Sequence, residues 1–371
     1  MCQGQCCNNL DHIRGRIVTV QILAPIRSQN NCVSPISYYR AILPLRTLAR
    51  HKPNDYNVVI ATAEQLINHS SLFLDNFDVY YLARVHAAGD EGPYSVAAFI
   101  KSVKGKEAKI VFDTDDDLTD EFRDLGTAEG FLAIARGADA VTVSTPYLAK
   151  HMKRHIGHKP HILPNCLDTG WFAKASLKAK RLHKGLTIGF IGTSSHYGDW
   201  EIAALGLRQI VKEFPDVTVI TAGYCPDYLK ELVPGIIDMA PVPYDYYPVL
   251  MAQFDVVCCA LDPDDGFCKS KSSIKALEAM AAARTLTNGT VGGAIAVATS
   301  MPVYRGVVAN KHNGLLVKEN TADSWYQTLA KIISDNVLRQ KISVQGLKWV
   351  KKNRDINTHY KEWDRVLREV A

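Results

Sequence analysis

The sequence lacks any apolar run close to the roughly 18 to 20 residues that a transmembrane helix requires. Its start, MCQGQCCNNLDH, lacks the apolar stretch of a secretory signal peptide. Low-complexity tracts and short internal repeats are also missing. From these absences we expect a soluble, cytoplasmic protein without a membrane span.

Paired cysteine spacings are missing as well. The nine cysteines are irregularly spaced, and Cys258 and Cys259 fall within the apolar run 254–261, so most are expected to be reduced thiols that behave as small hydrophobes. Two interpretations stay open for four residues near the N-terminus, a zinc site and a frayed end. The spacing of these residues is not a usual paired zinc-ligand pattern. They are Cys2, Cys6, Cys7 and His12.

The size and composition are those of a two-domain globular protein. A chain of 371 residues exceeds what one core usually organises, and 47% hydrophobic with 22% charged residues argues against extensive disorder. The formal net charge of +5 resides in residues 1–185, where basic runs occupy 101–109, 150–159 and 174–184. Each run alone fits a solvated face or a linker, whereas the three together favour a polyanionic partner.

Short β-rich apolar segments alternate with helix-like ones throughout the chain. Strands are expected at 16–23, 58–61, 78–82, 109–112, 140–143, 186–191, 217–221, 255–260 and 294–298. Helices are expected at 38–50, with an interruption near Pro44, and at 199–214 and 272–283. This alternation predicts an α/β fold with two parallel sheets. We predict domains at 1–175 and 186–350, a linker at 176–185 and a final segment at 351–371.

The segment GFIGTSSHYGDW, residues 189–200, joins a strand to a helix. A glycine turn at such a place lets backbone amides approach a phosphate, and the helix N-terminus adds about half a positive charge. Gly189 and Gly192 are three residues apart, so the G-x-G-x-x-G fingerprint of dinucleotide-binding oxidoreductases is absent. A phosphate-binding turn and a simple tight turn both stay open.

The segment DPDDGFCKSKSSIKALEAMAAAR, residues 262–284, leads from an acidic loop into a helix. If that helix points its start at a diphosphate, Lys271 and the free backbone amides can neutralise the charge that builds on a leaving nucleotide. Glu278, about two turns into the helix, is then placed to accept hydrogen bonds from a ribose diol. The alternative is an amphipathic helix with a solvated charged face.

A third segment, IVFDTDDDLTDEF, places four carboxylates within five residues at the end of a strand. Such carboxylates repel one another, and that cost is usually tolerated at a functional cleft. Three roles are open for them: to orient or deprotonate an acceptor hydroxyl, to bind a metal, or to cap the following helix. Capping explains one carboxylate more readily than all four.

Together these segments resemble glycosyltransferases of the GT-B fold, specifically family 4 and its phage-type relatives. The resemblance covers nearly the whole chain in seven ordered matches: Tyr38-Tyr39-Arg40 with Pro44 and Leu48, 112–118, 138–148, 163–165 with Asp168, 192–199, 271–280, and 313–317 followed by Trp325. It implies a GT-B architecture, with two Rossmann-like parallel-sheet domains facing an interdomain cleft. The last helix, about 359–370, would cross back onto the first domain.

The resemblance also implies a retaining transfer from a nucleotide diphosphate-sugar in the C-terminal domain to an acceptor in the N-terminal domain. The catalytic set would be Asp113, Asp115 and Asp116 at the acceptor, Lys271 at the diphosphate and Glu278 at the ribose. The donor-binding set would be Gly192, Thr193, Ser194, His196, Asp265, Gly266, Phe267, Ser272 and Lys275. A UDP-sugar is the expected co-substrate, with no tightly bound cofactor and no required metal.

One position departs from the family pattern. Many relatives carry a second glutamate eight residues before the one that matches Glu278, and here that position is Ser270. Asp264, Asp265 or the backbone at 266–267 would then recognise the sugar hydroxyls.

The expected acceptor is a hydroxymethylated pyrimidine, such as hydroxymethylcytosine, in phage DNA. The phage-type pattern and the basic first half, which would contact phosphates, motivate this expectation, and the protein would then act in the host cytoplasm. The alternative is a sugar or lipid acceptor in surface polysaccharide synthesis, because a basic surface also approaches anionic lipid headgroups. A nucleic-acid-binding module without turnover is disfavoured by Lys271, Glu278 and the acidic cluster.

Overall fold

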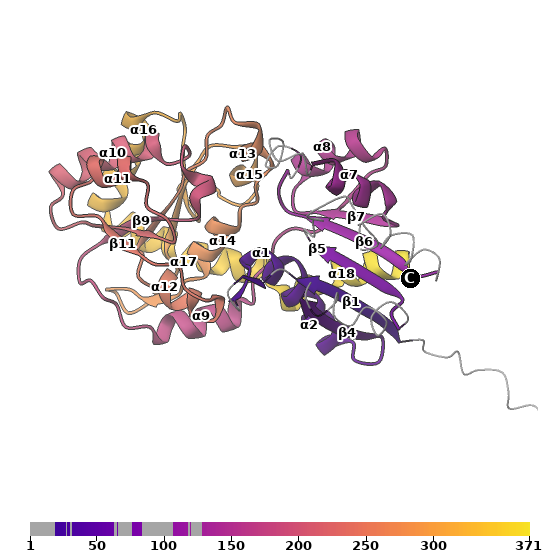
Figure 1. Ribbon diagram of the computed structural model, residues 1–371. Helices are drawn as coiled ribbons and strands as arrows, with labels where there is room; N and C mark the ends of the chain where they lie inside the picture. Colours follow the sequence, from indigo (N-terminus) through magenta and orange to yellow (C-terminus); the bar gives the residue numbers. More distant parts are fainter. Residues whose placement is uncertain are drawn as a thin grey trace, which may run out of the picture.

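A computed structural model describes residues 19–26, 28–29, 32–62, 65, 76–83, 107–117, 119 and 128–371. Figure 1 shows two α/β lobes side by side, each built around a parallel sheet of six strands. The candidate zinc ligands Cys2, Cys6, Cys7 and His12, and most of the basic run 101–109, lie outside the described residues. None of the described helices is both long and apolar enough to span a bilayer.

The N-terminal lobe has the strand order β4-β1-β5-β6-β7-β8. Its strands are β1 (Val20–Ile26), β4 (Tyr56–Thr62), β5 (Val79–Ala83), β6 (Lys109–Thr114), β7 (Ala140–Val143) and β8 (His161–Ile162), with a small antiparallel pair of β2 (Ser28–Gln29) and β3 (Cys32–Val33). Its helices include α1 (Pro35–Ser37), the π-helical η1 (Tyr38–Ile42), α2 (Leu43–His51), α7 (Ala128–Gly137) and α8 (Pro146–Ile156). Pro44 lies directly after the π-helical turn, in which the Leu43 N–H donates to the Tyr38 carbonyl five residues earlier, so the helix passes through the predicted interruption as a wider turn.

The C-terminal lobe has the strand order β11-β10-β9-β12-β15-β16. The strands are β9 (Thr187–Ile191), β10 (Thr218–Ala222), β11 (Ile237–Met239), β12 (Val256–Cys259), β15 (Ile295–Thr299) and β16 (Leu315–Val317), with a hairpin of β13 (Arg284–Thr285) and β14 (Val291–Gly292). The order reverses between β9 and β12, and parallel sheets bind ligands beyond the carboxyl ends of their strands at such a switch point. The predicted pair of parallel sheets is confirmed.

Helices cover the C-terminal sheet and connect its strands. They are η3 (Ser194–His196), α10 (Glu201–Glu213), α11 (Asp227–Leu232), η4 (Tyr244–Tyr246), α12 (Tyr247–Met251), α13 (Gly266–Ser270), α14 (Ile274–Ala281), α15 (Pro302–Arg305), α16 (Ala322–Ser334) and α17 (Asn336–Asn353). Figure 1 shows α13 and α14 on the side of this lobe that faces the N-terminal lobe. The five cysteines whose burial is described are buried free thiols, as predicted: Cys166, Cys225, Cys258, Cys259 and Cys268.

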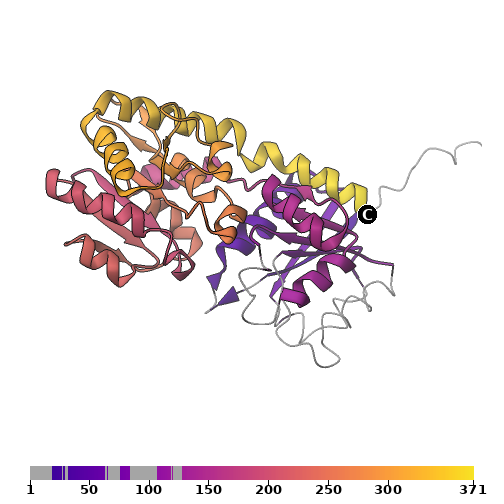
Figure 2. The same cartoon turned by 90° about the horizontal axis from the view of Figure 1, so that it is seen from above.

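The chain passes between the lobes at two places that lie side by side. The Leu167 N–H donates to the Arg354 carbonyl, and the Ile356 N–H donates to the Leu167 carbonyl, both at 2.9 Å. The first crossing leads into α9 (Thr169–Lys178) and the second into α18 (Ile356–Val370), which packs on α2. Figure 2 shows α17 and α18, in yellow, running along both lobes. Ion pairs secure α18 to the first lobe, among them Lys52 to Asp364 at 2.5 Å.

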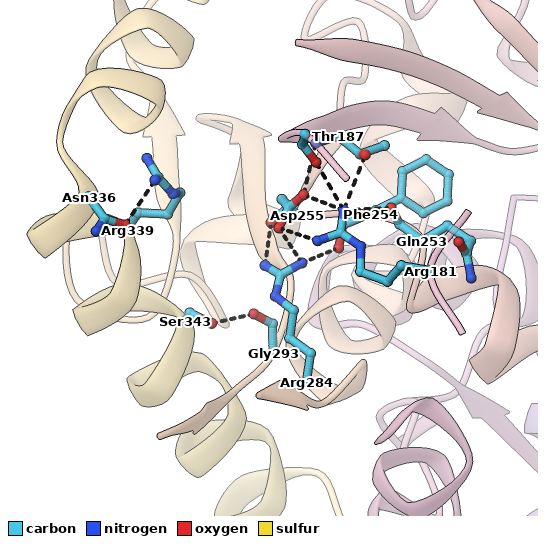
Figure 3. A network of polar contacts seen from close by, with 11 residues as sticks. Arg181, Thr187, Gln253, Phe254, Asp255, Arg284, Gly293, Asn336, Arg339 and Ser343 are labelled. Carbon is cyan, nitrogen blue, oxygen red and sulfur yellow. Dashed lines mark hydrogen bonds and ion pairs between the residues drawn. The ribbon is translucent and has the colours of Figure 1, made fainter. Parts of the chain in front are cut away.

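The predicted linker 176–185 is held firmly to the C-terminal lobe (Figure 3). Arg181 forms an ion pair with Asp255 at 2.6 Å, and Asp255 pairs with Arg284 at 2.7 Å. The Gln253 side chain accepts from the Leu182 N–H at 2.9 Å and donates to the Lys180 carbonyl at 3.2 Å. The polar contacts with Gln253 and Asp255 thus attach residues 180–182 to the C-terminal lobe. The chain crosses between the lobes before α9 and not within the predicted linker.

Candidate active site

The turn after β9 lies at the switch point of the C-terminal sheet, and close packing explains its glycine. A Cβ atom on Gly192 would stand 2.6 Å from the His196 ring and 3.0 Å from the Trp200 ring. Gly223, after the neighbouring strand β10, has a φ of +91°, and a Cβ there would lie 2.6 Å from the Gly192 carbonyl oxygen. A side chain at Gly192 would therefore collide with the His196 ring, and one at Gly223 would collide with the backbone of the turn.

His196 connects this turn to helix α14. Burial, together with the nearby Lys275 ammonium, lowers the pKa of His196 to about 3, so the ring is neutral. Its Nδ1 lies 2.5 Å from a carboxylate oxygen of Asp199, and its Nε2 lies 2.7 Å from the Lys275 Nζ. A neutral imidazole satisfies both contacts only if Nδ1–H donates to Asp199 and Nε2 accepts from Lys275. The ring therefore fixes the position of the Lys275 ammonium.

Two ammonium groups, those of Lys271 and Lys275, gather at the start of α14. Lys271 is buried at 7% exposure, and its Nζ lies over the Phe267 ring at 4.5 Å from the centroid. Burial, and then repulsion by Lys271, lowers the pKa of Lys275. Within the described part of the chain neither lysine has a carboxylate oxygen within 4.0 Å, and no side chain caps the α14 N-terminus. The excess positive charge favours an anion with several oxygens, such as a diphosphate.

Glu278 lies on α14 and is buried, at 4% exposure. The Tyr39 hydroxyl donates to its Oε1 at 2.5 Å, and the Tyr247 hydroxyl donates to its Oε2 at 3.0 Å. Burial raises the pKa of Glu278 to about 7, although these hydrogen bonds and Lys275 oppose the rise. The carboxylate that was predicted to hold a ribose thus has a phenol hydroxyl on each oxygen.

The raised pKa of Glu278 predicts a pH-dependent stability. The ordinary value is 4.5, so between pH 4.5 and about 7 the folded protein binds one more proton here than the unfolded chain, and stability falls as pH rises through this range. We expect Glu278→Gln to remove this dependence. The free energy of unfolding of the wild type relative to this variant should drop by up to about 3 kcal/mol between pH 4 and pH 8. Urea unfolding of both proteins across this range measures it, and parallel curves would contradict the assignment.

The predicted donor segment is also tied directly to the N-terminal lobe. The Asn165 amide donates to the Ser272 hydroxyl at 2.8 Å. The Ser270 hydroxyl accepts from the Asp117 backbone N–H at 2.9 Å. Ser270, at the position where many relatives have glutamate, therefore binds the acidic segment of the opposite lobe.

The four carboxylates after β6 have different environments, and Asp113 is not at the site surface. It is fully buried and accepts from Arg40 at 2.9 and 2.6 Å, from Tyr81 at 3.0 Å and from Thr142 at 2.5 Å. Its lone pairs are committed to the core of the N-terminal lobe, so we reassign Asp113 from an acceptor-facing to a structural role. Asp115 is buried and Asp116 is partly buried.

Asp117, which was not among the predicted site residues, lines a cavity of about 460 Å³ together with Gly266 of the C-terminal lobe. His151, on α8, lies with its Nε2 2.9 Å from the Asp117 carboxylate and 3.2 Å from the His155 Nε2. Burial favours a higher pKa for Asp117, but hydrogen bonds from His151 and Thr119 outweigh burial and lower this pKa below its usual value. The i, i+4 spacing of the two histidines was visible in the sequence, but their meeting with Asp117 was not.

The remaining predicted donor residues are distributed around these groups. Thr193 and Ser194 are exposed in the turn after β9, and Asp265 accepts from the Phe267 N–H at 2.7 Å at the start of α13. The structure thus brings the turn, α13 and α14 together, whereas Asp113 is buried in the core of the N-terminal lobe. Among the residues that the structure describes, no group of three or more His, Cys, Asp or Glu side chains is arranged to hold a metal ion.

No protein-family model matches the chain, and no curated protein matches it in sequence. Solved structures do resemble it. Alr3699/HepE from Anabaena, in complex with UDP and glucose, has a TM-score of 0.69 at 16% identity and covers 95% of this chain and 100% of that one. A glycosyltransferase from Rickettsia africae has a TM-score of 0.66 at 13% identity and covers 95% of this chain and 98% of that one.

Sucrose-phosphate synthase from Thermosynechococcus elongatus has a TM-score of 0.64 at 12% identity and covers 94% of this chain and 98% of that one. At these identities the likeness is one of fold. With the two parallel six-stranded sheets, it confirms the predicted GT-B architecture over nearly the whole chain.

Proposed function

We propose that the protein is a glycosyltransferase that moves a sugar from a nucleotide diphosphate-sugar to an acceptor hydroxyl. The observation that carries the proposal is the pair of ammonium groups, Lys271 and Lys275, at the uncapped start of α14 beside the switch point. Two solved structures of one similar protein, Alr3699/HepE, are complexes with UDP and glucose and with UDP-glucose, which supports a UDP-sugar as the donor.

The donor would lie on the C-terminal lobe and the acceptor on the N-terminal lobe. Lys271 and the first amides of α14 would stabilise the diphosphate as the sugar–oxygen bond breaks. The acceptor hydroxyl would enter through the cavity between Asp117 and Gly266, on the face from which the diphosphate leaves, and the configuration at the sugar carbon would be retained. Asp115 and Asp116 lie on the same segment as Asp117 and would face the acceptor. We assign no role to a metal ion.

For the acceptor we propose a hydroxymethylated pyrimidine in DNA. Helix α8, which lines the cavity together with α7, has exposed basic residues, and no acidic residue occurs between Asp139 and Asp168. The exposed cations are Lys150, Lys153 and Arg154 on α8 and Lys159 just after it. Phosphate contacts of this kind give affinity without sequence preference, and a base in a duplex would have to flip out to enter the cavity.

A lipid-linked or carbohydrate acceptor is the second candidate, and a separate surface favours it. Between 174 and 184 the exposed residues are four lysines and two leucines, with Leu177 and Leu182 exposed at 46% and 65%. Lysines around exposed leucines suit an anionic headgroup layer, so this face would contact a membrane peripherally.

One transfer assay separates these acceptors. The protein is incubated with UDP-glucose and other nucleotide-sugars, together with either hydroxymethylcytosine-containing DNA or a glycolipid extract, and each acceptor is weighed by mass spectrometry. A hexose mass on the DNA supports the first acceptor, and a mass on the glycolipid alone replaces it with the second. Lys271→Ala serves as the inactive control. Absence of transfer and of donor hydrolysis with every nucleotide-sugar would contradict the proposed function.

A further inference from the structure

We propose that the Tyr39 hydroxyl occupies the ribose-binding position on Glu278, and that a bound donor must displace it. Tyr39 is thus a positioning residue that couples donor binding to the contact between the lobes. The inference rests on the proposed function, because it takes Glu278 as the ribose acceptor.

The first support is the enclosure of the Glu278 carboxylate. Tyr39 and Tyr247 each donate to one oxygen, at 2.5 and 3.0 Å, and Glu278 and Tyr39 are only 4% and 5% exposed. A carboxylate enclosed in this way presents no open face to a sugar. Each carboxylate oxygen can accept a second hydrogen bond, but the phenols enclose it, so a ribose hydroxyl gains access only when one of the two phenols moves aside.

The second support is the origin of the two phenols. Tyr247 lies at the start of α12 in the same lobe as Glu278, whereas Tyr39 comes from η1 of the opposite lobe, 239 residues away in the chain. Loss of the Tyr39 bond therefore changes a contact between lobes and leaves each lobe's own packing in place. Tyr39 is the phenol that can leave.

The third support is the anchoring of η1. Arg40, the next residue, donates to Asp113, to the Leu163 carbonyl at 2.6 Å and to Asn165 at 2.7 Å, which fixes the backbone of η1 to the first lobe. Tyr38, on the other side, stacks on Tyr244 of the second lobe with ring centroids 3.6 Å apart. Release of Tyr39 thus leaves an aromatic contact that keeps the lobes together.

The neighbouring contacts of the donor segment follow the same pattern. Ser272 is bound by Asn165, and Ser270 by the backbone of Asp117, both from the N-terminal lobe. Hydrogen bonds across the lobe boundary therefore converge on residues of the segment that is to bind the donor. The Tyr39 contact is therefore one of several by which the N-terminal lobe reaches this segment.

The experiment measures UDP binding by isothermal titration calorimetry at pH 8, where Glu278 is ionised. Tyr39→Phe removes the competing hydroxyl and keeps the ring, so we expect it to bind UDP about tenfold more tightly than the wild type, the typical effect of one hydrogen bond to a charged group. Tyr247→Phe, the matched control, removes a hydroxyl that need not leave and should bind UDP no more tightly than the wild type.

A second ligand tests the reason for the tightening. The 2′,3′-dideoxy analogue of UDP has no ribose hydroxyl to place on Glu278, so the wild type and Tyr39→Phe should bind it equally. Equal or weaker UDP binding by Tyr39→Phe would overturn the inference while the proposed function stands. If the folded wild type binds neither UDP nor any other nucleoside diphosphate, the proposed function itself fails, and the inference with it.

Discussion

Replacing Lys271 with alanine is expected to reduce the turnover number for sugar transfer by about a hundredfold or more. The ammonium is buried, lies over the Phe267 ring and adds to the charge of Lys275 at the start of α14. Charge develops on the diphosphate as the bond to the sugar breaks, and a preorganised cation in a site with little water stabilises it strongly. Alanine removes this interaction from the transition state.

The measurement is the steady-state rate of UDP release with a saturating acceptor. Lys269→Ala is the matched control, because Lys269 is a lysine of α13 two residues before Lys271, and its Nζ donates to the Asp264 carbonyl at 3.4 Å. Its turnover should stay close to that of the wild type, and the thermal midpoints of both variants should be near the wild-type value. Full turnover by a folded Lys271→Ala protein would remove this lysine from the mechanism.

Replacing Asp113 with alanine should destabilise the fold by about 3–5 kcal/mol, which is a large part of the stability of a typical domain. Arg40 and Asp113 are both fully buried, and the alanine variant would leave the guanidinium without its carboxylate in the core. The hydroxyls of Tyr81 and Thr142 would also lose an acceptor. An unpaired buried charge is among the most costly changes that a core can suffer.

Urea unfolding gives the change in free energy, or, if the variant does not accumulate, the soluble yield reports it. The double variant Arg40→Met with Asp113→Leu removes both charges, and we expect it to recover much of the lost stability. Sugar transfer by this double variant, per folded molecule, then distinguishes the two roles of Asp113. An alanine variant as stable as the wild type would show that the carboxylate is not a structural partner of Arg40.

Several features could be predicted because they depend on neighbours in the chain. The buried strand at β7 has the predicted limits, and most other predicted strands lie within a few residues of the observed ones. The alternation of apolar strands with helices indicates parallel sheets, since parallel strands need crossover connections. Lys275 and Glu278 lie three residues apart on α14, so their proximity follows from helix geometry, and Lys271 precedes this helix by three residues.

Other features depend on partners that local sequence does not reveal. In the sequence the four carboxylates of the acidic cluster look alike. The ion pair with Arg40, 73 residues earlier in the chain, gives Asp113 a structural role. In the same way, the polar stretch 176–185 reads as a linker, and Asp255, 74 residues after Arg181, fastens it to a sheet.

The sequence by itself determined the two parallel sheets and the location of the cationic segment, because periodicity and spacing act over a few residues. Only the tertiary structure decided which carboxylates are buried, where the chain crosses, and that Tyr39 covers Glu278. Those outcomes depend on how the two lobes pack together and on which distant side chains pair with a buried charge. A charge that is removed from water on folding must be paired, because leaving it unpaired costs too much free energy.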